Sequence, residues 1–279
     1  MILFPNAKIN LGLRILRRRE DGYHDLVTGM MPVDWCDILE LVPARGAEST
    51  LTVSGNALAN CPPEKNLVFK ALRATERAVG HELPTDIYLR KIVPDGAGLG
   101  GGSSDAAFTI KGLNELHGLG LGEEKMAEIA SEIGSDCPFF IYNRPMLAEG
   151  RGTELRPVDI NLEGVRAILV AKPEAEAVST REAYAGAHPR EPECGESIED
   201  ILSHPAAKWR GLGLRNDFEE SVFPIRPAIK ELKERMLDAG ALYAAMTGSG
   251  AAVTGLFPTL ADARRAAEGY AFSHVTEVR

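Results

Sequence analysis

A run of glycines between residues 96 and 102 constrains the fold of this chain more than any other stretch. Five of these seven residues are glycine, so the backbone can take positive φ values and approach a ligand closely. The alternating residues 87–93 predict a strand before the run, and residues 103–117 predict a helix after it. A glycine loop that opens a helix presents free N–H groups and the positive end of the helix dipole. The pattern therefore indicates a phosphate site.

The residues at and after the start of this predicted helix distinguish the stretch from two familiar kinds of phosphate-binding loop. Ser103 and Ser104 stand where an N-cap is expected, and Asp105 suits the positive end of the dipole. A Walker loop requires a lysine at the helix start, and this chain has none there, so the loop is not of the Walker type. The dinucleotide fingerprint matches the loop as a string, but residues 123–133 predict a second helix where that fold needs a strand. A capping turn without a ligand is the structural alternative.

Composition and charge narrow the functional classes. The chain has 279 residues, enough for one large or two ordinary domains, and a net charge of −9. Its only basic block is residues 17–19, so the electrostatic footprint for nucleic acid is absent. The four cysteines form no CxxC pair, which suits free thiols in a cytoplasmic protein. Residues 239–261 are uncharged, but the Thr247–Gly250 run predicts strand, turn and strand rather than a membrane span. No obligate protein partner is indicated.

Residues 7–16 alternate strictly between apolar and polar positions, which predicts a strand. Lys8 and Asn10 share its polar face, because successive side chains of a strand point to opposite sides. That face is either solvated, as on any half-buried strand, or it places a cation and an amide over a ligand. The strand by itself leaves both interpretations open.

Two further stretches combine turn signals with polar side chains. Tyr23 and His24 follow an Asp-Gly turn, and an aromatic ring beside an imidazole can hold a planar base, although such pairs often only pack a turn. Asn66 is predicted to cap a helix that ends near Gly80. Asp136 precedes another predicted helix, either as its N-cap or as a general base that accepts a hydroxyl proton in phosphoryl transfer.

The second half of the chain predicts a separate domain. Residues 144–164 contain prolines and polar runs, which predict loops and a boundary near Gly152. We therefore expect domains at 1–152 and 153–279. Elements of the second domain follow the order βαββαβ, which is typical of a ferredoxin-like fold. The Thr247–Gly250 run joins two of its strands, as a plain hairpin turn or as a second glycine loop that closes over phosphates.

Six stretches, in this order along the whole chain, resemble the GHMP small-molecule kinases. They are Pro5-Asn-Ala-Lys8-Ile-Asn10-Leu11, Asp21-Gly-Tyr23-His24, Pro94-Asp-Gly-Ala-Gly98-Leu-Gly-Gly-Gly-Ser-Ser104, Gly134-Ser-Asp136-Cys-Pro138, Asn216-Asp-Phe-Glu219 and Thr247-Gly-Ser-Gly250. Within the superfamily the set is most similar to kinases of the non-mevalonate isoprenoid pathway, whose substrate is a cytidine-diphosphate derivative of methylerythritol. The resemblance implies a two-domain α/β (α+β) fold. An N-terminal ribosomal-protein-S5-like domain would precede the ferredoxin-like domain, with the active site in the cleft between them.

The resemblance also implies roles for single residues. Asp136 would be the base that takes the proton from the 2-hydroxyl of the substrate, and Lys8 would stabilise the charge of the transferring phosphoryl group. ATP would contact Pro94, Asp95, Gly96, Ala97, Gly98, Leu99, Gly100, Gly101, Gly102, Ser103, Ser104 and, near the adenosine, Asn66. The substrate would contact Asn10, Tyr23, His24, Thr180, Tyr184, Gly248, Ser249 and Gly250, with the two tyrosines as stacking faces.

ATP chemistry implies Mg²⁺, for which Ser103, Ser104 and Asp105 are the candidate ligands. The chain departs from the expected pattern at Tyr184, where a phenylalanine is usual, and both rings can stack. Two alternatives remain. One is another kinase of the superfamily, acting on mevalonate, homoserine or a sugar, although these substrates offer no base to stack. The other is a catalytically silent nucleotide-binding regulator, against which the presence of both Lys8 and Asp136 speaks.

Overall fold

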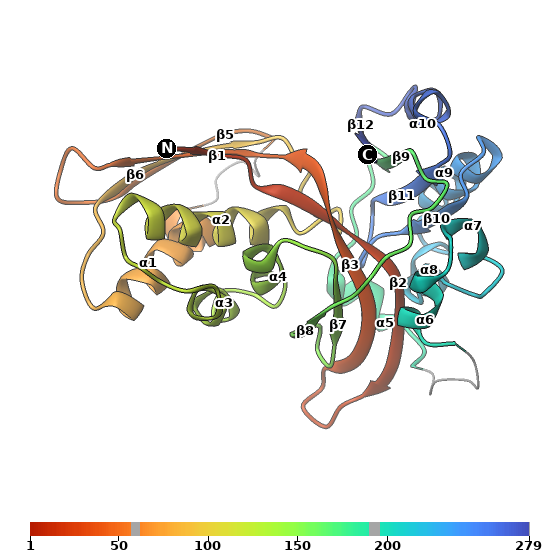
Figure 1. Cartoon of the computed structure of the whole chain (residues 1–279), viewed down its shortest axis with the longest axis horizontal. Helices are drawn as coiled ribbons and strands as arrows, with labels where there is room; N and C mark the ends of the chain where they lie inside the picture. Colours follow the sequence, from red (N-terminus) through yellow and green to blue (C-terminus); the bar gives the residue numbers. More distant parts are fainter. Residues whose placement is uncertain (57–61, 190–195, 279) are drawn as a thin grey trace. The chain divides into compact units, whose positions relative to one another are not determined.

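The structure is a computed structural model that describes residues 1–56, 62–189 and 196–278 (Figure 1). The chain divides into two compact units, and each takes residues from several parts of the sequence. The first unit comprises 1–7, 34–95 and 100–144, and the second comprises 8–33, 96–99 and 145–279. The boundary near Gly152 stays a prediction about domains along the sequence.

The first unit is a four-stranded sheet with α1 and α2 packed against one face (Figure 1). Its strand order is β1–β4–β6–β5, with β5 parallel to β6 and the other pairs antiparallel. The elements are β1 (Ile2–Leu3), β4 (Ile38–Pro43), β5 (Thr50–Gly55), the 3₁₀ helix η1 (Pro63–Lys65), α1 (Leu67–Val79), β6 (Thr85–Lys91), α2 (Gly101–Leu116), α3 (Glu123–Ser131) and α4 (Cys137–Tyr142).

Local sequence explains the elements around the glycine run. Burial alternates along β6, with Ile87 and Leu89 inside and Tyr88 exposed, so the predicted strand is confirmed. The Oδ1 atom of Asn66 accepts a hydrogen bond from the first turn of α1 at 2.9 Å, and Gly80 ends that helix with φ 79°. Both predicted ends of α1 are therefore confirmed.

Helix α2 begins two residues earlier than expected. Gly100, with φ 70°, is its N-cap residue, so Ser103 and Ser104 lie inside the first turns and the predicted serine cap was wrong. A Cβ atom at Gly101 would lie 3.2 Å from both the Nζ atom of Lys91 and the nearest side-chain atom of Val93. The absence of a side chain at Gly101 allows this close approach of the first helical residue.

The second unit contains two antiparallel sheets with the strand orders β2–β3–β7–β8 and β10–β11–β9–β12. Its elements are β2 (Asn6–Arg18) and β3 (His24–Cys36), each of which also has residues in the first unit, then β7 (Met146–Glu149), β8 (Glu154–Pro157), β9 (Ala167–Lys172), α5 (Thr180–Ala185), α6 (Ile198–Ser203), α7 (Ala206–Trp209), α8 (Phe218–Val222), α9 (Pro227–Asp238), β10 (Tyr243–Met246), β11 (Val253–Phe257), α10 (Leu260–Ala267) and β12 (Phe272–Glu277).

Strand order in the last sheet confirms the ferredoxin-like prediction. Numbered from β9, the strands lie in the order 2-3-1-4 from β10 to β12, all neighbours antiparallel. Ile229, Leu232 and Met236 of α9 are buried in the core that this sheet shares with its helices. These three side chains are three and four residues apart, which is the spacing of one helical face.

The hairpin of β7 and β8 corrects the prediction of loops over residues 144–164. Met146 and Ala148 pair with Met30 and Thr28 of β3, which lie far away in the sequence. A four-residue strand carries too short a pattern to be recognised, and its partner is supplied only by the fold.

Residues 239–261 form β10, a turn and β11, as predicted. Among the described residues, no helix is both long enough and apolar enough to cross a membrane. Cys36 and Cys137 are free thiols, and Cys61 and Cys194 lie outside the described residues.

Candidate functional site

Lys8 and Asn10 are buried on β2, with exposed fractions of 3% and 4%. The interpretation of their face as solvated was therefore wrong. Lys8 Nζ donates to Asn10 Oδ1 at 2.5 Å, and Asn10 Nδ2 donates to Thr28 Oγ1 at 3.0 Å. The backbone N–H of Asn10 donates to Thr247 Oγ1 at 2.9 Å. These bonds hold the ammonium group of Lys8 at a defined place beside the Thr247–Gly250 turn.

The tip of the glycine-rich loop, residues 96–99, contacts the second glycine turn, residues 247–250, within the second unit. The N–H of Ala252 donates to the carbonyl of Ala97 at 3.1 Å. Gly98 has φ 74°, and a Cβ atom there would lie 2.2 Å from the carbonyl oxygen that opens the turn. The fold thus joins two glycine segments that the sequence keeps far apart.

Helix α5 brings two predicted substrate residues to the same unit. The hydroxyl of Thr180 lies 3.4 Å from that of Ser249. Tyr184 stacks on His24 with ring centres 4.7 Å apart and an interplanar angle of 16°. The edge of Phe218 supports Tyr184 at 4.7 Å. Burial, aided by the charge of Arg18, lowers the pKa of His24, so this ring is neutral at pH 7 and has one donor and one acceptor.

Tyr23 is 54% exposed on the turn between β2 and β3. Its backbone N–H donates to Asp21 Oδ1 at 3.1 Å. The guanidinium carbon of Arg151, from the β7–β8 turn, lies 3.6 Å from the ring centre of Tyr23. Arg151 was not predicted, because nothing in the sequence relates this residue to the Tyr23 turn before β7 pairs with β3.

Asn216 and Glu219 support the second glycine turn, and sequence reasoning assigned them no role. Asn216 Nδ2 donates to the carbonyls of Met246 and Gly248 at 2.7 and 2.8 Å. Glu219 Oε1 accepts the N–H of Met246 at 2.9 Å, and burial raises the pKa of this carboxyl group. The available signal was the Asn216–Glu219 stretch itself, which carries part of the family resemblance but does not indicate a role for either residue.

The ends of the glycine-rich loop, residues 94–95 and 100–104, belong to the first unit together with Asn66. Ser104 Oγ is buried and has no hydrogen-bond partner among the described residues. Asp105 is 2% exposed and accepts a hydrogen bond from Lys91 at 2.7 Å. Among the described residues, no group of three or more histidine, cysteine, aspartate or glutamate side chains could hold a metal ion.

Asp136 occupies the N-cap position of α4 in the first unit, with Pro138 in the first turn as predicted. Its side chain accepts no capping hydrogen bond from the described residues of α4, so the helix does not use it as a cap. Burial raises the pKa of the adjacent Cys137 thiol to about 11, which keeps this thiol protonated near neutrality.

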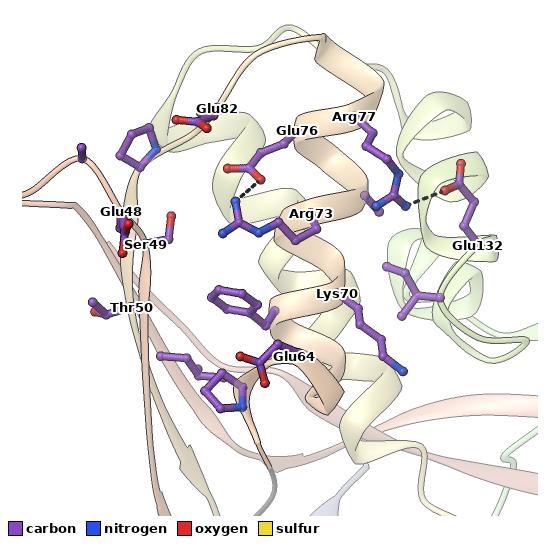
Figure 2. Close-up of a pocket in the computed structure, with 17 residues that line it drawn as sticks. Glu48, Ser49, Thr50, Glu64, Lys70, Arg73, Glu76, Arg77, Glu82 and Glu132 are labelled. Carbon is purple, nitrogen blue, oxygen red and sulfur yellow. Dashed lines mark hydrogen bonds and ion pairs between the residues drawn. The ribbon is translucent and has the colours of Figure 1, made fainter.

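A cavity of about 970 Å³ lies elsewhere in the first unit, between α1 and the start of β5 (Figure 2). Figure 2 shows two ion pairs in its wall, Arg73 with Glu76 at 2.7 Å and Arg77 with Glu132 at 3.2 Å. None of the predicted site residues is among the described residues that line this cavity.

Two family models match the chain, one in each half. The model of the GHMP kinases N terminal domain matches residues 66–144, and the model of the GHMP kinases C terminal matches residues 198–274. The chain therefore belongs to the GHMP kinases and is a small-molecule kinase with their two-domain α/β fold.

Individual relatives show to which family within the GHMP kinases the chain belongs. The 4-diphosphocytidyl-2-C-methyl-D-erythritol kinase of Bacteroides fragilis (strain YCH46) is 46% identical over 258 residues, 92% of either chain. A crystal structure of 4-(cytidine 5'-diphospho)-2C-methyl-D-erythritol kinase is 32% identical, with a TM-score of 0.82 over 99% of this chain and 98% of that one. Within the GHMP kinases, the chain belongs to the 4-diphosphocytidyl-2-C-methyl-D-erythritol kinase family. A homoserine kinase from Cytophaga hutchinsonii, 18% identical with a TM-score of 0.73 over 98% of this chain and 94% of that one, shares the fold alone.

Proposed function

We propose that this protein transfers the γ-phosphoryl group of ATP to the 2-hydroxyl of 4-(cytidine 5'-diphospho)-2-C-methyl-D-erythritol, in the non-mevalonate route to isoprenoid precursors. The observation that carries the proposal is that His24 stacks on Tyr184, in a chain that belongs to this family. Tyr184 lies on the same short helix as Thr180. Flat aromatic faces with a neutral imidazole suit a cytosine base, which mevalonate and homoserine lack. The proposed partners are small molecules, and a cytoplasmic location stays a prediction.

Lys8 and Asp136 are the proposed catalytic residues. The substrate oxygen attacks the γ-phosphorus, the bond to the bridging oxygen of ADP breaks, and Asp136 accepts the hydroxyl proton. Lys8 supplies positive charge to the phosphoryl oxygens, and its bond to Asn10 Oδ1 aims the ammonium group. Because Asn10 lies beside Lys8, it is proposed to contact the substrate as well.

ATP is proposed to bind through the backbone of residues 94–104, with Asn66 near the adenosine. Gly96, Gly98 and Gly100 all have positive φ, and no described atom lies within 4 Å of a Cβ built on Gly96. This open, left-handed backbone fits a triphosphate. When bound with ATP, Mg²⁺ would offset the negative charge of the phosphates. Ser103 and Ser104 fit such a phosphate–metal group, whereas the Asp105 carboxylate is already bound to Lys91.

The test is ATP consumption by the purified protein with Mg²⁺ and the cytidyl substrate, beside mevalonate, homoserine and galactose. We expect turnover on the cytidyl compound alone. Asp136→Asn and Lys8→Met are expected to lower kcat by about 10²–10⁴-fold or more while circular dichroism stays native. Turnover on another alcohol would support a different kinase specificity. ATP binding with no turnover on any of the four would favour the silent regulator.

A further inference from the structure

Three ionisable side chains are buried together beneath the two ends of the glycine-rich loop. Asp37, Lys91 and Asp105, here called the root cluster, have exposed fractions of 0%, 5% and 2%. All three belong to the first unit. Asp105 was a candidate Mg²⁺ ligand from the sequence, but Lys91 already binds its carboxyl group, and Asp37 and Lys91 are not among the residues proposed to contact ATP, substrate or metal. The cluster therefore needs an explanation of its own.

Asp37, between β3 and β4, holds the chain where it enters the loop. Its Oδ1 atom accepts the backbone N–H groups of Ile92 at 2.5 Å and Val93 at 2.8 Å, and its Oδ2 atom accepts a short hydrogen bond from Lys91 Nζ. These two N–H groups lie just after β6 and just before Pro94. One carboxylate thus fixes the last residues before the loop begins.

Lys91 connects this entry to the helix that leaves the loop. Its Nζ atom donates to Asp105 Oδ2 at 2.7 Å, and Asp105 lies near the start of α2. The approach is close enough that a Cβ atom at Gly101 would lie 3.2 Å from the same Nζ atom. The root cluster therefore ties residues 91–93 to residues 101–105.

We propose that Asp37 is a positioning residue for ATP, which fixes the distance between the two ends of the glycine-rich loop through Lys91 and Asp105. The inference rests on the proposed role of residues 94–104 in binding the triphosphate. Glycines have more backbone freedom to lose than other residues, so a loosely held loop would have to be ordered by the ligand itself. With both ends held, the N–H groups are arranged before ATP arrives, and less affinity is lost to ordering.

General stabilisation of the core is a weaker explanation for the root cluster. Two carboxyl groups and one ammonium group must all leave water, and such buried ion pairs are frequently no more stabilising than apolar side chains of similar size. The cluster is also directional, because the Asp37 carboxylate contacts the backbone at the loop entry rather than a distant element. Its geometry serves the loop more directly than it serves the sheet.

Asp37→Ala and Asp37→Asn test the proposal, with Glu76→Ala as the matched control. Glu76 is a buried carboxylate of the same unit that accepts from Leu83 N at 3.0 Å and from Arg73 at 2.7 Å, in the wall of the separate cavity (Figure 2). The measurements are the Kd of MgATP by isothermal titration calorimetry, KM and kcat for both substrates, and the unfolding midpoint. We expect Asp37→Ala to raise the Kd of MgATP about tenfold or more, and Asp37→Asn less, because its oxygen still accepts the two N–H groups. KM for the cytidyl substrate should stay within about twofold for both.

The control separates positioning from stability. Glu76→Ala should lower the unfolding midpoint without changing the Kd of MgATP. The inference is overturned when the folded Asp37 variants bind MgATP as tightly as the wild type does. It is also overturned when Glu76→Ala raises the Kd of MgATP as much as the Asp37 variants do. Where Asp37→Ala fails to fold, the Kd of Asp37→Asn decides. Calorimetry needs no turnover, so a wild type that binds MgATP but phosphorylates no substrate refutes the proposed function and leaves this comparison valid. A wild type that does not bind ATP refutes both.

Discussion

Gly98 lies so close to Thr247 that a Cβ atom at position 98 would stand 2.2 Å from the Thr247 carbonyl oxygen. Gly98 also has φ 74°, a conformation that other residues adopt only at a cost. The contact joins the tip of the glycine-rich loop to the second glycine turn. This turn also contacts the buried Lys8–Asn10 pair, because Thr247 Oγ1 accepts the backbone N–H of Asn10. Only glycine fits this contact without displacing the turn.

We therefore expect Gly98→Ala to lower kcat/KM by about 100-fold or more, because the turn at 247–250 must move to admit the methyl group. Gly120→Ala is the matched control, since Gly120 has φ 67° and no described atom within 4 Å of its built Cβ. The control should cost only about 1 kcal/mol of stability and leave kinetics unchanged. Steady-state kinetics and thermal unfolding of both variants check this. Wild-type activity in Gly98→Ala would contradict the contact.

Asn216→Ala should loosen the second glycine turn. Removing the amide leaves the buried carbonyls of Met246 and Gly248 without this donor, which should cost about 1–3 kcal/mol of unfolding free energy and raise KM. Asn161→Ala is the control, because its amide donates to Ser203 O at 3.2 Å at an exposed position. Urea unfolding and kinetics measure both effects. Equal losses in the two variants would show that Asn216 has no special relation to the turn.

Arg151→Ala should weaken binding of the cytidyl substrate. The guanidinium group lies 3.6 Å from the ring centre of Tyr23, and its loss frees the ring to move, which we expect to raise the substrate KM about three- to tenfold. KM for ATP should not change. Arg144→Ala is the matched control, since Arg144 lies 5.5 Å from the ring centre of Tyr142 in the first unit. A changed KM for ATP in Arg151→Ala, or an unchanged KM for the substrate, would count against this role of Tyr23.

Stability should depend on pH through Asp105. Burial, with the Asp37 carboxylate adding to it and Lys91 opposing it, raises the pKa of Asp105 from 3.8 to about 7. The folded protein therefore binds this proton more strongly than the unfolded chain. The stability it contributes is complete below pH 3.8 and is lost as pH rises to about 7. Asp105→Asn removes this proton and keeps an acceptor for Lys91.

The unfolding free energy of the wild type should thus fall relative to that of Asp105→Asn between pH 4.5 and about 7.5, by about 1–3 kcal/mol. Denaturant titrations at several pH values measure the difference. Parallel curves for the two proteins would mean that Asp105 keeps an ordinary pKa in the folded state.

Local pattern was sufficient where an element's own residues decide its form. The alternation of β6, the cap and stop of α1, and the βαββαβ order of the second half all appear in the structure. Local pattern was insufficient to predict β7 and the start of α2. Met146 becomes strand through pairing with Met30, and Gly101 becomes helix where it meets Lys91 and Val93. Met30 is distant from Met146 in the sequence, and Lys91 and Val93 meet Gly101 only through the path of the loop between them.

The site divides in the same way. Composition and order of residues determined the glycine-rich loop, the Lys8–Asn10 strand face, the aromatic pair near the Asp-Gly turn and the resemblance to the GHMP kinases. The tertiary structure decided that Lys8 and Asn10 are buried, and that Asn216 supports the second glycine turn. It also decided that Asp37 holds the loop entry. The physical reason is range: backbone conformation follows from neighbouring residues, whereas burial, hydrogen bonds and ring contacts depend on distances that only the folded chain sets.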